Sequence, residues 1–200
     1  MTLEIRETKE LPKKILIYGM DGTGKSTFAA EYCKKNHLKP ICLDVDYTNL
    51  TDVPCIKFER GNSLKVEKQV LTFIKDVKES DDYDTIIIDG ISSLLLLLVS
   101  NNKGLAKYGD RTNSLNKILN ELARSRLNFI LVGQIDMAIN EESSSAVVNI
   151  NSIVNEKYLC TYDEGLKKYD QEVKKYRGPE QLEAEVRKVE RSRRMNKNFE

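Results

Sequence analysis

The segment from Gly19 to Ser26 reads G-M-D-G-T-G-K-S, which has the form G-x-x-x-x-G-K-S of a phosphate-binding loop. It follows the apolar residues 15–18 and precedes residues that favour a helix, so the loop is expected to join a strand to a helix N-terminus. Such a loop offers a polyphosphate converging backbone N–H groups and the positive end of a helix dipole. The sequence therefore predicts that this segment binds a polyphosphate.

Residue types within the loop suit distinct tasks. Glycine at positions 19, 22 and 24 allows the chain to curl tightly, because a side chain at positive φ would clash. Lys25 is expected to reach the β- and γ-phosphates, and the Ser26 hydroxyl to complete a Mg²⁺ coordination shell. The predicted nucleotide-binding set is Gly19, Met20, Asp21, Gly22, Thr23, Gly24, Lys25, Ser26 and Thr27.

Composition sets the broad class of protein. The chain has 200 residues, of which 32% are charged, and a formal net charge of +1, as expected for one soluble domain with a sizeable core. Residues 1–14 lack the apolar segment of a signal peptide, and the apolar run 91–99 is too short to span a bilayer. Four cysteines without a C-x-x-C pair predict reduced thiols rather than a metal site. We therefore expect a cytoplasmic protein without membrane contact.

Apolar runs of strand length alternate with segments of helical period, which predicts β-α-β units and a doubly wound α/β fold with a mostly parallel sheet and helices on both faces. Strands are expected at 14–18, 40–45, 85–89 and 129–132, and helices at 25–36, 64–80, 94–98 and 115–123. Polar composition predicts loops at 101–110 and, as a long mobile segment, at 138–152. The predicted organisation is an N-terminal extension (1–13), a core (14–165) and a charged, basic, helical C-terminal tail (166–200).

Acidic residues follow two of the predicted strands. Asp89 ends the apolar strand 85–89, where an acid beside a phosphate-binding loop is expected to hold Mg²⁺ together with Ser26. Gly90 comes next, so a carboxylate that activates water must come from elsewhere. Asp44 and Asp46 lie at the carboxyl end of the predicted strand 40–45, and either could orient water against a γ-phosphate.

These segments resemble RecA-like ATPases in their order. Residues 86–94 (I-I-I-D-G-I-S-S-L) are similar to the metal-binding strand and following helix of that family. The resemblance implies that Asp46, within L-D-V-D, takes the position of the family's water-activating glutamate. It also implies that Gln134, after L-V-G, senses the γ-phosphate, and that 136–152 corresponds to a flexible DNA-contacting loop. ATP and Mg²⁺ are the implied cofactors, and short single-domain phage recombinases are the most similar relatives.

Positive charge gathers near the C-terminus. Between positions 187 and 197 the chain carries six basic residues and a single acidic one, Glu190. Such a cluster could neutralise nucleic-acid phosphates or could be a solvated helix. Tyrosines 158, 162, 169 and 176 could stack on bases or pack the C-terminal segment onto the sheet.

The sequence therefore predicts an ATPase, with Lys25, Asp46 and Gln134 as catalytic residues, that acts on single-stranded DNA in recombination, annealing or repair. Expected partners are single-stranded DNA, further copies of the chain with active sites at subunit interfaces, and a single-stranded-DNA-binding protein. An arginine from a neighbouring copy (111, 124 or 126) could complete the site. Two alternatives remain open: a P-loop phosphotransferase acting on a small molecule, and a non-catalytic ATP-dependent switch protein.

Overall fold

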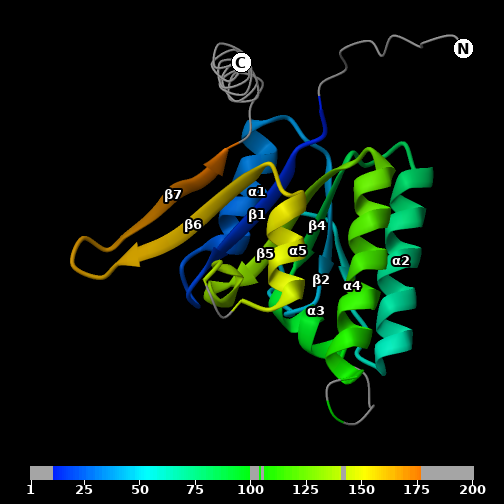
Figure 1. Cartoon of the computed structure of the whole chain (residues 1–200). Coiled ribbons are helices and arrows are strands. Elements are labelled where there is room, and N and C mark those ends of the chain that lie inside the picture. Colours follow the sequence, from blue (N-terminus) through cyan, green and yellow to red (C-terminus); the bar gives the residue numbers. More distant parts are fainter. Residues whose placement is uncertain (1–10, 100–103, 105, 141–142, 177–200) are drawn as a thin grey trace, which may run out of the picture.

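The structure is a computed structural model that describes residues 11–99, 104, 106–140 and 143–176. Within these residues the elements follow one another in the order β1 (Lys14–Gly19), α1 (Lys25–Lys35), β2 (Pro40–Asp44), β3 (Cys55–Lys57), α2 (Ser63–Glu79), β4 (Thr85–Asp89), α3 (Ile91–Leu97), α4 (Ala106–Ser125), β5 (Asn128–Gln134), the 3₁₀ turn η1 (Ile135–Met137), α5 (Ser145–Ile153), β6 (Glu156–Asp163) and β7 (Lys168–Tyr176). Figure 1 shows these elements along the chain.

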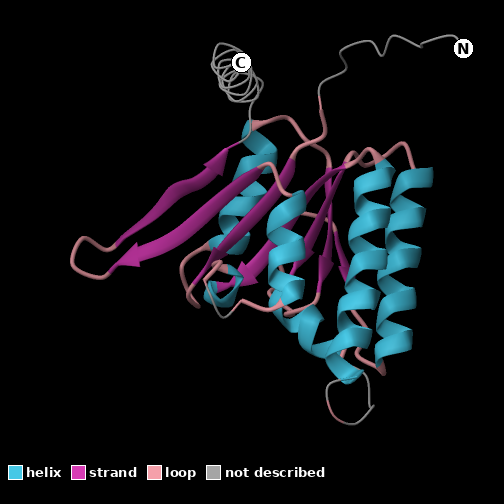
Figure 2. Ribbon diagram, viewed as in Figure 1, coloured by secondary structure: helices cyan, strands magenta, loops and turns pink. Residues whose placement is uncertain are grey.

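All strands belong to one sheet, in the order β3-β2-β4-β5-β1-β6-β7. Every neighbouring pair is parallel except β6 and β7, which form an antiparallel hairpin at one edge. The hairpin projects to one side of the molecule in Figure 2. The doubly wound, mostly parallel fold predicted from the sequence is confirmed.

Helices cover both faces of the sheet because the central strands are apolar on both faces. Strand β4 is buried at every residue. On one face, Ile15, Ile17 and Ile87 pack with Ala29 and Cys33 of α1. The alternate residues face a larger cluster to which α2, α3, α4 and α5 contribute. Because both faces of the central strands are buried, polar side chains are expected at the ends of these strands.

Strand register aligns the predicted site residues. Asp44 is opposite Asp89 in the β2–β4 ladder, and Gly19 is opposite Gln134 in the β1–β5 ladder. Because these strands are parallel, their carboxyl ends meet along one edge of the sheet, where open α/β proteins bind ligands. The start of the phosphate-binding loop therefore lies beside the other candidate residues.

Helix α5 corrects the expectation of a long mobile loop over 138–152. Ala146, Val147 and Ile150 share one buried face and pack into the main core. The Asn151 side-chain amide donates to the carbonyls of Met137 (3.1 Å) and Val147 (2.9 Å), which ties the helix to η1. The interpretation of 136–152 as a flexible loop is therefore wrong for the described part of this segment, whereas its contact with DNA stays a prediction.

Other boundaries also differ from the predictions. Helix α4 begins at Ala106, inside the expected polar loop 101–110. The three-residue strand β3 lies between the expected strand 40–45 and the expected helix 64–80, where no strand was predicted. Strand β7 continues the sheet beyond position 165, where the core was expected to end. The basic cluster 187–197 and the extension up to residue 10 lie outside the described residues, as do predictions placed on them.

Candidate phosphate and metal site

The phosphate-binding loop connects β1 to α1 and is shaped by its glycines. Gly24 is the N-cap of α1 with φ 73°, a left-handed conformation that glycine adopts without strain. A side chain on Gly19 would overlap the carbonyl group of Cys160 in the neighbouring strand β6. The Thr23 hydroxyl donates to the carbonyl oxygen of Met20 at 2.8 Å, a hydrogen bond within the loop that stabilises its tight turn. The first N–H groups of α1, which follow this loop, have no partner within the helix and are available to a ligand.

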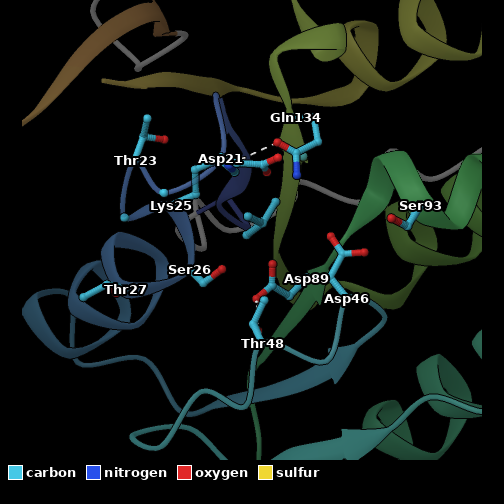
Figure 3. A pocket seen from close by; sticks show the side chains of 14 residues that line it. Asp21, Thr23, Lys25, Ser26, Thr27, Asp46, Thr48, Asp89, Ser93 and Gln134 are labelled. Carbon is cyan, nitrogen blue, oxygen red and sulfur yellow. Dashed lines mark hydrogen bonds between the residues drawn. The ribbon is translucent and has the colours of Figure 1, made fainter. Parts of the chain in front are cut away.

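A cavity of about 510 Å³ lies above this loop, at the carboxyl ends of the strands. It is lined by Asp21, Gly22, Thr23, Gly24, Lys25, Ser26, Thr27, Asp46, Thr48, Asp89, Ser93, Val132, Gly133 and Gln134. Figure 3 shows side chains from α1, from the β2 loop and from the end of β5 around it. The cavity therefore gathers most of the residues predicted from the sequence. Of the predicted loop set, Gly19 and Met20 are outside the lining, and the Met20 side chain is exposed.

Lys25 links the loop to the last residue of β5. Its ammonium group donates to the carbonyl oxygen of Met20 at 2.6 Å and to Gln134 Oε1 at 3.3 Å (Figure 3). The backbone N–H of Gln134 in turn donates to Ser92 Oγ at 2.9 Å, and the Ser92 hydroxyl donates to Asp136 at 2.7 Å. Gln134 is thus held on both its backbone and its side chain, at the position where the predicted γ-phosphate sensor would be needed.

Asp89 forms the floor of the cavity and is only 2% exposed. Thr48 Oγ1 donates to Asp89 Oδ2 at 2.7 Å. Burial raises the pKa of the Asp89 carboxyl, and the negative charges of Asp44 and Asp46 raise it further, whereas hydrogen bonds from Thr48 and Ser26 lower it. A buried carboxylate with hydroxyl neighbours fits a hard divalent ion.

The donor set suits Mg²⁺ in particular. Ser26, Thr48 and Asp89 supply oxygen atoms only, and Mg²⁺ prefers oxygen ligands. The described residues contain no group of three or more histidine, cysteine or acidic side chains that could enclose a metal. Mg²⁺ typically keeps waters and phosphate oxygens in its shell and takes one or two protein carboxylates. The residues present therefore fit Mg²⁺ bound together with a phosphate, with Ser26 and Asp89 as its protein ligands.

The two acidic residues after β2 occupy different environments. Strand β2 ends at Asp44, so strand alternation does not extend to Asp46. Both oxygens of Asp44 accept backbone N–H groups, from Thr48 at 2.9 Å and from Asn49 at 3.0 Å, and the residue is buried. Asp46 instead lines the cavity. Asp44 therefore shapes the loop, and Asp46 is the carboxylate placed to contact a bound molecule.

Sequence reasoning missed Thr48 and Ser92. Thr48 follows Asp44 and Asp46 at alternating positions, D-x-D-x-T, which is the signal that could have suggested it. Tyr47 and Asn49 on either side of it adopt positive φ values of 56° and 51°. This irregular turn brings the Thr48 hydroxyl to Asp89, so the alternation draws attention to Thr48 but does not predict this contact.

The candidate arginines lie apart from the cavity of their own chain. Arg111 lies on α4, where its guanidinium stacks over the Tyr108 ring at 5.3 Å. Arg124 and Arg126 come just before β5 begins, at the amino edge of the sheet and thus opposite the cavity. Among the described lining residues, Lys25 is the single basic side chain.

The sheet order, the phosphate-binding loop and the acid on β4 together define a RecA-like P-loop NTPase. A family model described as an AAA domain matches residues 11–161, and the chain belongs to this family. No curated protein sequence matches the chain. A solved structure of a KaiC-like protein from the hyperthermophilic archaeon Pyrococcus horikoshii OT3 is similar, with a TM-score of 0.56 at 17% identity, over 82% of this chain and 78% of that one. This likeness concerns the fold.

No helix in the described part of the chain is both long and apolar enough to cross a membrane.

Proposed function

We propose that this protein binds Mg²⁺–ATP in the cavity above the phosphate-binding loop and hydrolyses it. The observation that carries the proposal is the convergence of Lys25, Ser26, Asp46 and Asp89 on one cavity of about 510 Å³. These four residues come from three separate segments of the chain, which the fold brings together. A lysine, a hydroxyl and two carboxylates around a phosphate loop are the groups that phosphoryl transfer to water requires.

Each residue has a distinct task in this proposal. Lys25 and the N-terminal amides of α1 hold the phosphate oxygens, and Ser26 and Asp89 hold the metal ion, which neutralises charge on the phosphates when bound. Asp46 accepts a hydrogen bond from the attacking water and orients it. Gln134, in contact with Lys25, registers whether a γ-phosphate is present. A basic residue from a neighbouring copy of the chain supplies further positive charge, since Lys25 alone does so among the described lining residues.

We further propose that ATP turnover serves binding to single-stranded DNA in recombination, annealing or repair, as in the short phage recombinases that the motif order resembles. Support comes from the sequence: six basic side chains gather between positions 187 and 197. Neutralising several phosphates releases counterions, so binding through this cluster should weaken steeply with salt. A single-stranded-DNA-binding protein would be the natural partner on the same strand.

The deciding experiment measures ATP hydrolysis by the full chain with and without single-stranded DNA over a series of salt concentrations. Turnover that DNA increases at low salt, and does not increase at high salt, supports the proposal. Transfer of phosphate to a nucleoside or metabolite, independent of DNA, would instead show a small-molecule phosphotransferase. Tight ATP binding without turnover under every condition would show a nucleotide-dependent switch.

A further inference from the structure

The cavity is polar almost throughout. Among its described lining residues, Val132 is the single one with a purely hydrocarbon side chain, and it is buried. Phosphates suit such a lining, but a nucleobase is a flat, weakly hydrated ring that gains most from an aromatic surface. A nucleotide held by the loop would therefore place its base outside the cavity, against a neighbouring surface.

Two exposed tyrosines lie beside the loop, on the β6–β7 hairpin. Tyr162 and Tyr169 are directly opposite each other across the hairpin, with ring centroids 4.8 Å apart and ring planes inclined at 46°. They are 40% and 53% exposed, so ring surface remains available to a ligand. An exposed aromatic pair of this kind is a natural stacking surface for a base.

The hairpin places Tyr169 of this pair beside the phosphate-binding loop. Cys160 of β6 is opposite Gly19, so the next residues of β6 continue past the end of β1 and alongside the loop. A methyl group at the Cα of Gly24 would lie 3.3 Å from Tyr169 Cδ1 and 3.5 Å from its Cε1. Because Gly24 also lines the cavity, the Tyr169 ring adjoins the place where phosphates are proposed to bind.

We propose that Tyr162 and Tyr169 form the nucleobase-binding surface of this site. The inference rests on the proposed function, because it assumes that a nucleotide binds through its phosphates at the loop. Contact with Gly24 favours the base of that same nucleotide over a base of a separate nucleic-acid strand, which has no reason to approach the loop so closely. Stacking does not read the edge of a base, so the site should accept ATP and GTP with similar affinity.

The test compares ligands with and without a base by titration calorimetry of the full chain in Mg²⁺. Tyr169→Ala should weaken ATP and GTP binding by about ten-fold to a hundred-fold and leave inorganic tripolyphosphate binding unchanged. Tyr169→Phe should keep the wild-type affinity, because the ring remains. Leu166→Ala is the matched control: Leu166 is an exposed apolar residue, 75% accessible, at the turn of the same hairpin.

Other outcomes separate this inference from the proposed function. Equal weakening of tripolyphosphate and ATP by Tyr169→Ala would mean that the ring only supports the loop, and would overturn the inference. Unchanged ATP affinity would overturn it too. Wild-type protein that binds tripolyphosphate as tightly as ATP would overturn the stacking surface alone, whereas failure to bind either ligand would overturn the proposed function as well.

A second measurement uses the wild-type protein, so its result does not depend on whether a variant folds. Light-activated 8-azido-ATP, bound to the wild-type protein and followed by peptide mass spectrometry, should label the hairpin between positions 160 and 170. Excess unlabelled ATP should remove this labelling. Competed labelling confined to other segments would overturn the inference.

Discussion

The carboxylate of Asp46 lies directly against the Cα atom of Gly90. A methyl group on Gly90 would approach Asp46 Cγ to 2.6 Å and its two oxygens to 2.7 and 2.8 Å. Gly90 also has φ 104°, a conformation that other residues rarely adopt. Gly90, directly after the proposed metal ligand Asp89, thus makes room for Asp46, the proposed water-activating residue on the loop after β2.

Gly90→Ala should therefore displace Asp46 and reduce ATP turnover, and it should lower the free energy of unfolding by about 1–2 kcal/mol through backbone strain. Steady-state kinetics and denaturant unfolding measure the two effects. Gly104→Ala is the control, because Gly104 has φ 67° but open space where its methyl would lie. A similar loss of stability with unchanged turnover is expected there. Full activity of Gly90→Ala would contradict the assigned position of Asp46.

Asp46→Asn should preserve ATP binding and lower kcat by about a hundred-fold or more, since the amide is a poor acceptor for the proton of water. Asp44→Asn should act on stability instead. Two backbone N–H groups each bond a separate Asp44 oxygen, and asparagine keeps only one oxygen acceptor, so one of these bonds is lost at a cost of about 1–3 kcal/mol. Calorimetric binding, turnover and unfolding of both variants check this division. Hydrolysis lost in Asp44→Asn alone, with normal stability, would reverse the two roles.

Lys25→Ala should abolish measurable ATP binding or reduce kcat/KM by at least about a hundred-fold, because it removes the single cation of the described cavity lining. Lys34→Ala provides the comparison, since Lys34 lies in the last turn of the same helix, away from the loop. Calorimetry and turnover assays report the effect. Unchanged turnover in Lys25→Ala would remove the phosphate-binding role of the loop.

Thr48→Val should raise the Mg²⁺ concentration needed for half-maximal turnover by about three-fold to ten-fold, because Asp89 loses the hydroxyl that orients it. Thr48→Ser should keep the wild-type value, since it retains the hydroxyl. Magnesium titrations of ATP turnover distinguish the two variants. An equal shift in both would show that the hydroxyl is not what positions Asp89.

The parts of the fold that could be predicted are those with a local signal. The loop from Gly19 to Ser26 and the apolar strand ending at Asp89 are readable because glycine placement and β-branched runs are dictated locally. Strand β7 was missed because most of its residues are charged or polar, as those of an edge strand open to solvent can be. Helix α5 was missed because its short buried face lies among serine and asparagine residues that favour loops.

The candidate site was predictable only as a set of residues. Whether Asp44 or Asp46 enters the cavity depends on where β2 stops, which tertiary packing decides. The roles assigned to Asp46 and Gln134 stay predictions, as does the trans-acting arginine. Contacts between distant segments, such as Thr48 with Asp89 and Tyr169 with Gly24, have no counterpart in the spacing of the sequence.

The Ser92 hydroxyl makes two hydrogen bonds: it accepts one from the backbone N–H of Gln134, at the end of β5, and donates one to Asp136 in η1. That turn is bound to α5 by Asn151. A movement of α3, which starts two residues after Asp89, would therefore also displace η1 and, through it, α5. Hydrogen bonds thus connect the sheet edge at the proposed nucleotide site to α5, whose Val148 is exposed, so that a change at the nucleotide could alter a surface open to another molecule.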